Sequence, residues 1–467
     1  MTKGVFGTDG IRGRVGVYPI TPEFCLRLGW SIGKVFADQC PDSDPQTSSD
    51  GAVKPTVLIG KDTRISGYMF EAALQAGLVS AGADVKLLGP MPTPGIAYLT
   101  RTLKGAAGIV ISASHNPFGD NGIKFFDASG SKLSDDLEAQ IEAALRQAMD
   151  CEPSEALGRA SRVPDAVGRY VEFCKSSVSQ SLDLSGMKLV IDCANGATYQ
   201  IADKVFAEMG ARVETIAASP NGFNINKECG STHPETLMAR VVESGADVGI
   251  AFDGDGDRVV MVDRKGRLVD GDQIVYAIAK HRQRQGTLNG GVVGTLMSNL
   301  GLQLALQQDT IEFARANVGD RYILEMLKAK NWQLGAEPSG HILTLDLTST
   351  GDAIISALQV LLAMQSAQTD LDELVAGVTK MPQTLVNVVT SNPKEVMQHP
   401  AVAQIVAAFA AELGDRGRIL VRPSGTEPLL RIMVEGADES EICGVAEQIA
   451  VAAKQIAVAA KQAAGDS

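Results

Sequence analysis

The 467-residue sequence is poor in several kinds of residue, and these shortages argue against some classes of function. It has five histidines and two tryptophans, and aromatic residues make up only 5% of it. Positive charge is also scarce, because the formal net charge is −13. A groove for nucleic acid or a face for anionic membranes needs a basic surface, so the sequence argues against both. A phosphorylated small molecule is still possible, since a few local arginines suffice to bind it.

Paired cysteines and long apolar runs are missing as well. The seven cysteines are odd in number, widely scattered and never arranged as C-x-x-C, which is typical of reduced thiols in a cytosol. The N-terminal stretch "MTKGVFGTDGIRG" has no apolar signal-peptide core. No window approaches the ~20 apolar residues that a membrane-spanning helix needs. We therefore expect a soluble, cytoplasmic protein.

What the sequence does contain is a repeated local plan. The run "PTVLIGKDTR" (55–64) predicts a strand and loop, and Phe70, Leu74 and Leu78 follow at helical spacing before Gly82. Residues 186–216 repeat this order of strand, loop, helix, glycine and strand, and residues 290–337 contain a looser third copy. The three copies predict three related α/β domains with mainly parallel, mixed sheets.

Polar stretches and a change of pattern predict the domain boundaries. Residues 40–55 have few apolar side chains and predict an exposed loop, and residues 151–166 predict a linker. After residue 380, short strands alternate with amphipathic helices, which indicates a smaller α+β domain. An exact duplication of "IAVAAKQ" near the C-terminus predicts only a longer helix. The predicted domains are 1–160, 161–266, 267–380 and 381–467.

A first candidate site is "FDGDGDRVV" (252–260), where Asp253, Asp255 and Asp257 alternate with glycines between two apolar runs. Three like charges in five residues repel one another, and a Mg²⁺ or Ca²⁺ ion explains them better than a plain polar hairpin does. The loop is not an EF-hand, because Arg258 and Arg264 stand where that motif has glycine and glutamate.

A second candidate site is "ISASHNPFGDNGIKFF" (111–126), which sets Ser114 and His115 side by side. A phosphoryl group on Ser114 could supply the further oxygen ligand that a metal held by three aspartates requires. His115 and Lys124 could then form hydrogen bonds, add positive charge or transfer protons. The plain alternative is a turn serine beside a surface histidine. A serine hydrolase is disfavoured, because the G-x-S-x-G motif is absent.

Two more loops offer polar groups suited to a phosphosugar. In "VRPSGTEPLLRIMVEG" (421–436) an arginine, two hydroxyls and free backbone N–H groups predict a phosphate site, against the alternative of a simple Pro-Ser-Gly turn. In "GAEPSGHIL" (335–343) a carboxylate, a hydroxyl and an imidazole could bind sugar hydroxyls, although a loop histidine explains the pattern equally well. The residues concerned are Arg422, Ser424, Gly425, Thr426, Glu337, Ser339 and His341.

Together these motifs resemble the α-D-phosphohexomutase family. "SASHNP" is similar to the family's phosphoserine loop, "DGDGDR" to its metal loop, "EPSGH" to its sugar-binding loop and "RPSGTEP" to its phosphate loop, all in family order. The segments "FGTDGIRG", "GKDTRISGYM", "DCANGAT", "VGDRYILE" and "STGDAI" resemble most closely the branch that acts on glucosamine phosphates. The resemblance spans essentially the whole chain and implies four domains around a central cleft.

The resemblance also implies a role for each motif. Ser114 would be the phosphoserine and Asp253, Asp255 and Asp257 the ligands of one Mg²⁺ per chain, with the phosphoserine completing the coordination. The loop containing Glu337, Ser339 and His341 would hold the sugar, and the one containing Arg422 would hold the phosphate that is not transferred. The groups around the transferring phosphoryl would be Arg12, His115, Lys124 and Arg258.

The implied reaction interconverts glucosamine 6-phosphate and glucosamine 1-phosphate through a hexosamine 1,6-bisphosphate, for UDP-N-acetylglucosamine and cell-wall synthesis. One departure concerns the sugar loop, where Pro338 replaces the Gln or Met of other members and makes the loop stiffer. The alternatives are a phosphomannomutase or phosphoglucomutase of the same fold, a Mg²⁺-dependent sugar phosphatase, and a non-catalytic phosphosugar-binding protein. The sequence leaves open whether a kinase phosphorylates Ser114 and whether the protein is a monomer or a dimer.

Overall fold

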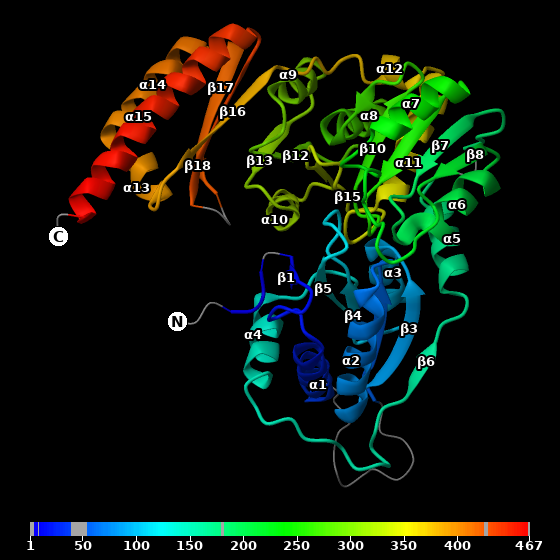
Figure 1. Cartoon of the computed structure of the whole chain (residues 1–467). Coiled ribbons are helices and arrows are strands. Elements are labelled where there is room, and N and C mark those ends of the chain that lie inside the picture. The colour runs from blue at the N-terminus through cyan, green and yellow to red at the C-terminus, as the bar shows by residue number, and fades with distance from the viewer. Residues whose placement is uncertain (1–3, 8, 39–53, 179–181, 425–427, 466–467) are drawn as a thin grey trace. The chain divides into compact units, whose positions relative to one another are not determined.

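The computed structural model describes the chain apart from residues 1–3, 8, 39–53, 179–181, 425–427 and 466–467. Two compact units make up the chain: residues 1–295 with 316–376, and residues 296–315 with 377–467. The polar stretch 40–55 lies largely outside the described residues. Each unit is built around its own sheets and core (Figure 1).

The first sheet of the larger unit has the strand order β1-β5-β4-β2-β3-β6. Strands β2, β3, β4 and β6 run parallel, whereas β5 pairs antiparallel with both β1 and β4. Its elements are β1 (Ile11–Arg14), α1 (Pro22–Asp38), β2 (Thr56–Lys61), α2 (Ser66–Ser80), β3 (Asp84–Pro90), α3 (Thr93–Thr102), β4 (Ala107–Ile111), β5 (Asp120–Asp127), α4 (Asp135–Ala144) and β6 (Ala160–Arg162).

The predicted helix of this first copy is confirmed, because Phe70, Leu74 and Leu78 are all buried on one side of α2. One strand of this sheet has no signal in the sequence. The predicted linker 151–166 contains β6, which adds to the sheet edge beside β3. β6 consists of three exposed residues, so it lacks the alternation of apolar and polar residues by which a strand is recognised.

The second sheet has the order β11-β10-β9-β7-β8, and the third copy of the plan pairs β12 in parallel with β14, which pairs antiparallel with β15. The second predicted copy is confirmed by β7, α6 and β8, and the third by β12, α10 and β14. The elements are α5 (Ala166–Ser176), β7 (Lys188–Asp192), η1 (Ala197–Gln200), α6 (Ala202–Glu208), β8 (Arg212–Ile216), α7 (Glu235–Ser244), β9 (Val248–Phe252), β10 (Val259–Asp263), β11 (Leu268–Val269), α8 (Gly271–Arg284), β12 (Val292–Thr295), α10 (Asp320–Lys330), β14 (Leu334–Ala336), β15 (Ile342–Thr344), α11 (Ala353–Ala367) and α12 (Leu371–Leu374).

The smaller unit contains an antiparallel sheet of order β16-β18-β17, whose core is completed by α15 packed on β16 and β18. In Figure 1, α14 and α15 cover one face of this sheet. The α+β prediction for this region is therefore confirmed. The elements are α9 (Leu300–Gln308), β13 (Phe313–Ala316), β16 (Gln383–Val389), α13 (Pro393–Gln398), α14 (Pro400–Leu413), η2 (Gly414–Arg416), β17 (Gly417–Pro423), β18 (Leu429–Gly436) and α15 (Glu439–Gly465).

Helix α15 corrects one expectation from the sequence. The duplicated heptad does extend a helix, but residues 439–459 are also long and apolar enough to cross a membrane by length and composition. This is weak evidence for a membrane span, since core helices of soluble proteins pass the same test. Ile442, Ala446 and Ile449 of this helix are fully buried in the core of the smaller unit.

Helices α1 and α2 cross at two glycines, and this crossing generates a prediction about stability. A Cβ on Gly77 would lie 2.1 Å from the carbonyl oxygen of Leu26, and one on Gly29 would lie 2.4 Å from that of Leu74. Both contacts are with backbone atoms, so the two helices would have to move apart to relieve them. We expect Gly77→Ala to lower the free energy of unfolding by about 1–3 kcal/mol.

Urea denaturation followed by circular dichroism would measure this change. Gly168→Ala is the matched control, because Gly168 lies in helix α5 and a Cβ added there would meet no atom within 4 Å. That substitution should raise stability by about 0.5–1 kcal/mol. Equal effects of the two substitutions would contradict the proposed close packing of α1 on α2.

Candidate active site

Ser114 lies in the loop between β4 and β5, and its conformation differs from that of an ordinary turn serine. Its φ is +51°, in the left-handed region that residues other than glycine seldom adopt. The residue is 1% exposed. Its hydroxyl donates a hydrogen bond to Asp253 Oδ2 over 2.6 Å. The structure thus brings together the serine and the aspartate loop that the sequence singled out separately.

The aspartate loop connects β9 to β10, as the apolar runs on either side predicted. Asp253, Asp255 and Asp257 are all buried, and one carboxylate oxygen of each lies within 4.8 Å of the others. Asp253 Oδ1 accepts the backbone N–H groups of Asp257 and Arg258, both over 3.2 Å. Asp255 Oδ1 and Asp257 Oδ1 accept no hydrogen bond from any described residue. Oxygen ligands in this arrangement fit a hard divalent cation.

Lys124 supplies positive charge at this cluster from the neighbouring strand β5. Its Nζ lies 2.9 Å from Asp255 Oδ2 and 3.1 Å from Asp257 Oδ2. Burial disfavours its charge, but Asp255 and Asp257 outweigh burial and hold the pKa of Lys124 well above its ordinary value. Burial and the charges of Asp257 and Asp255 instead raise the pKa of Asp253. For Asp257, Lys124 and His341 outweigh burial and lower the pKa.

His115 and Arg258 form a pair beside the serine. Arg258 Nη1 lies 3.0 Å from His115 Nδ1, and Ser114 Oγ lies 3.3 Å from the same nitrogen. Burial, followed by the charges of Arg258 and Arg12, lowers the pKa of His115 to about 4. Because a guanidinium can only donate, His115 is neutral with Nδ1 as acceptor and its proton on Nε2. Arg12 is ion-paired with Asp9.

The predicted sugar loop forms the turn between β14 and β15. Glu337 accepts the N–H of Gly319 over 3.1 Å, and Ser339 is placed to donate to Glu337 over 3.5 Å. His341 is 3% exposed, and its Nδ1 lies 3.8 Å from Asp257 Oδ1. Burial opposes its charge, but Asp257 outweighs burial and raises the pKa of His341. His341 therefore contacts the aspartate loop, whereas Glu337 is partly exposed.

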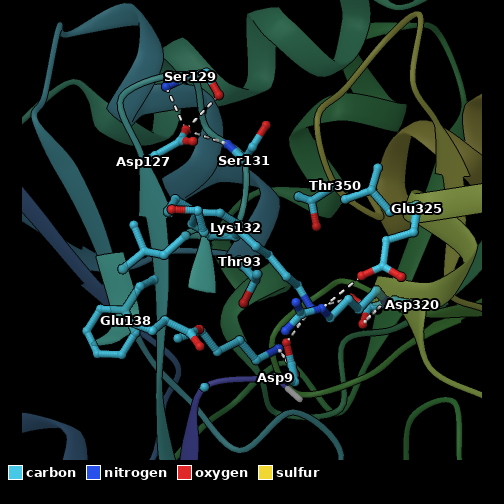
Figure 2. Close-up of a pocket in the computed structure, with 18 of the residues that line it drawn as sticks. Asp9, Thr93, Asp127, Ser129, Ser131, Lys132, Glu138, Asp320, Glu325 and Thr350 are labelled. Atoms are coloured by element: carbon cyan, nitrogen blue, oxygen red, sulfur yellow. Dashed lines mark hydrogen bonds and ion pairs between the residues drawn. The ribbon is translucent and has the colours of Figure 1, made fainter. Parts of the chain in front are cut away.

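A cavity of about 400 Å³ beside Lys124 and Asp257 contains residues that sequence reasoning missed. Figure 2 shows Lys132 reaching between two carboxylates. Its Nζ lies 2.7 Å from Asp9 Oδ1 and 2.5 Å from Asp320 Oδ2. Asp9 and Asp320 belong to the motifs "FGTDGIRG" and "VGDRYILE", which offered a signal. Nothing in the sequence around Lys132 points to this position.

The predicted phosphate loop belongs to the smaller unit and follows β17. Arg422 lies opposite Arg431 on the neighbouring strand β18, and Ser424 donates its backbone N–H to the carbonyl of Leu429 over 2.8 Å. Burial and the nearby charge of Arg431 lower the pKa of Arg422. Two arginines facing each other across a ladder are suited to an anion. Gly425 and Thr426 lie outside the described residues.

Family models cover almost all of the chain. Those of phosphoglucomutase/phosphomannomutase match it in four parts: alpha/beta/alpha domain I at residues 3–150, domain II at 168–266, domain III at 270–381, and the C-terminal domain at 385–452. The four-domain architecture expected from the sequence is thus present, with three α/β domains and a C-terminal one.

Relatives of known name are similar over nearly their full length. Phosphoglucosamine mutase from Hahella chejuensis is 56% identical over 450 residues, covering 96% of this chain and 98% of that protein. Phosphoglucosamine mutase from Pseudomonas aeruginosa (strain LESB58) is 57% identical with the same coverage. These identities extend across all four matched domains.

Solved structures share the fold at low sequence identity. A phosphoglucomutase/phosphomannomutase family protein from Burkholderia thailandensis superposes with a TM-score of 0.78 at 22% identity, over 97% of each chain. N-acetylphosphoglucosamine mutase from Aspergillus fumigatus, solved with GlcNAc-6P and magnesium, has a TM-score of 0.65 at 17% identity over 97% of this chain and 96% of that one. The chain therefore belongs to the phosphoglucomutase/phosphomannomutase family, the α-D-phosphohexomutases.

Proposed function

We propose that the protein interconverts glucosamine 6-phosphate and glucosamine 1-phosphate by passing a phosphoryl group through Ser114. The observation that carries this proposal is the 2.6 Å hydrogen bond from Ser114 to a buried, converging set of three aspartates. The names of the relatives that are 56–57% identical favour an amino sugar. The product would feed UDP-N-acetylglucosamine synthesis in the cytoplasm.

The aspartates fit one Mg²⁺ per chain. Asp255 Oδ1 and Asp257 Oδ1 are buried acceptors without a hydrogen bond from the described part of the chain, so they are available to a cation. Asp253, Asp255, Asp257 and the phosphoryl group on Ser114 would hold it. Bound Mg²⁺ supplies positive charge that offsets the charge of the phosphoryl oxygens.

The remaining groups divide the work of one turnover. Arg258 and Arg12 attract the phosphoryl oxygens, while neutral His115 offers an N–H on Nε2. Lys124 stays protonated and places its positive charge beside Asp255 and Asp257. The hydroxyl proton of Ser114 points to Asp253 Oδ2, which would accept it as Oγ forms a bond to the phosphorus of the 1,6-bisphosphate. The bond from that phosphorus to the sugar oxygen breaks, and this oxygen takes up a proton, so one hydroxyl is consumed and one is formed.

Recognition of the sugar and of its second phosphate involves the other two loops. Glu337 would accept hydrogen bonds from sugar hydroxyls, and Ser339 would donate one to them. His341 would hold the sugar loop in place through its contact with Asp257. Arg422, Ser424, Gly425 and Thr426 would bind the phosphate that is not transferred. The hexosamine 1,6-bisphosphate would serve as intermediate and primer, unless a kinase phosphorylates Ser114 first.

Ser114→Ala removes the proposed phosphoryl carrier, and we expect turnover to fall by at least ~10³-fold. A coupled assay for glucosamine 1-phosphate measures turnover, and intact mass after incubation with a 1,6-bisphosphate measures phosphorylation of the chain. Ser176→Ala, on the exposed side of α5, is the control and should keep both. The role of Ser114 is wrong if the alanine variant stays within a few-fold of wild type.

Asp255→Asn replaces one proposed ligand with a neutral group of equal size. We expect the Mg²⁺ concentration for half-maximal activity to rise at least ~10-fold, because the site loses one charged oxygen. Isothermal titration with Mg²⁺ provides a readout that does not depend on turnover. The exposed Asp165→Asn is the matched control. An unchanged Mg²⁺ affinity of Asp255→Asn would rule out the assignment of this residue.

Pro338 allows a test of sugar selection. The wild-type protein should convert glucosamine 6-phosphate faster than it converts glucose 1-phosphate or mannose 1-phosphate, each with Mg²⁺ and the matching 1,6-bisphosphate. Pro338 contributes a carbonyl that accepts the N–H of Gly271 over 3.2 Å, which any residue can do. We therefore expect Pro338→Gln to change KM by less than about threefold. If glucose 1-phosphate or mannose 1-phosphate is converted fastest, the phosphoryl transfer through Ser114 stands, but the assignment of a glucosamine phosphate as the substrate is wrong.

A further inference from the structure

The backbone of Ser114 needs outside support. Its left-handed φ of +51° costs free energy for a residue with a side chain, and such a residue persists only where its surroundings hold it. Its N–H donates to Ser112 Oγ over 2.9 Å, which secures one side of the peptide. The carbonyl oxygens of Ser114 and Asn116 both accept hydrogen bonds from two residues that lie far away in the sequence.

Arg64 is the first of these residues. It lies between β2 and α2, and its side chain is completely buried. Its Nη2 donates to the carbonyl oxygens of Ser114 and Asn116, both over 2.9 Å, and its Nε lies 3.1 Å from Asp62 Oδ2. The planar guanidinium presents its N–H groups at fixed angles, so the two carbonyls are held at a fixed spacing.

Asn226 is the second, and it comes from the loop between β8 and α7 in the neighbouring domain. Its Nδ2 donates to the same two carbonyls, over 2.9 Å to Ser114 and 3.1 Å to Asn116. The aspartate loop packs against this group as well. A Cβ on Gly254 would lie 2.7 Å from both Asn226 Nδ2 and the Ser114 carbonyl oxygen. Serine loop, aspartate loop and Asn226 therefore meet at one point.

We propose that Arg64 and Asn226, the anchor residues, position Ser114 for phosphoryl transfer without touching the substrate. The inference rests on the proposed function, in which Ser114 alternates between a hydroxyl and a phosphate. In the phosphorylated form Oγ no longer donates to Asp253, and close to two negative charges lie beside the aspartates. The anchor residues bind carbonyl oxygens, so their hydrogen bonds survive this change and keep Oγ in place.

The test compares Asn226→Ala, Arg64→Lys and the double variant with wild type. We expect kcat to fall about 10–100-fold for Asn226→Ala with KM within about threefold, because a displacement of the order of an ångström at the reacting atom is enough. Phosphorylation of Ser114 by a 1,6-bisphosphate in a single turnover should slow by the same factor. The double variant should cost much less than the product of the two single effects, since both residues bind the same carbonyls.

Asn224→Ala is the matched control. Asn224 belongs to the same loop, and its side chain bonds Asn221 and Ser219 instead of the serine loop. It should leave kcat unchanged, and the melting temperature of Asn226→Ala should match that of this control within a few degrees. A purely structural role would lower the melting temperature and leave kcat of the folded protein at the wild-type value.

The outcomes separate the inference from the function on which it rests. If wild-type Ser114 takes a phosphoryl from the bisphosphate and folded Asn226→Ala does so at the same rate, the anchor role is wrong while the proposed function stands. If the wild-type protein is not phosphorylated at Ser114 at all, both are overturned. Should Arg64→Lys fail to fold, Asn226→Ala alone decides the question.

Discussion

The mutual repulsion of three buried carboxylates is the constraint on which the rest of the site depends. Asp253, Asp255 and Asp257 place three acidic groups within 4.8 Å of one another and away from water. Burying an unpaired charge costs free energy comparable to the net stability of a domain, so positively charged groups must lie close to these carboxylates. Lys124 and His341 provide part of it, and their positions follow from this requirement.

The sheet registers bring that counter-charge to the aspartates. β5 pairs with β4 antiparallel, so Lys124 on β5 and Ser114 beyond the end of β4 belong to one hairpin. The short turn between β14 and β15 places His341 against Asp257 from a third segment. Each segment contributes one charged or hydroxyl group, and none of them could form the cluster alone. This explains why Ser114 and Asp253, which are 139 residues apart in the sequence, share a hydrogen bond.

How far the sequence predicts the site depends on whether the signal is local. The aspartates were found because glycines at alternate positions mark a converging loop, and the flanking apolar runs mark the two strands of its hairpin. The three copies of the α/β plan were found for the same reason, since each strand and helix carries its own periodicity.

Strand β6 was missed because its three exposed residues carry no such pattern. Asp9, Lys132 and Asp320 were missed because their ion pairs join segments more than a hundred residues apart. Arg12 and Arg258 entered only through the family resemblance, because an isolated arginine has no pattern that marks it.

In the proposed function, a strained residue would carry a group whose charge changes in every cycle. Repulsion between a phosphate on Ser114 and the aspartates would favour release of the left-handed backbone, and a metal would offset this only while it is bound. The hydrogen bonds to the carbonyls of Ser114 and Asn116 involve neither the Ser114 hydroxyl nor a carboxylate of the aspartate loop. Their donors come from two domains, so the conformation of the serine is tied to the contact between these domains. One set of groups, the anchor residues, fixes the backbone of the serine loop, and a separate set balances the negative charge of the aspartates. Because the two sets are separate, a phosphoryl group could be gained and lost at Ser114 while the position of Oγ stays the same.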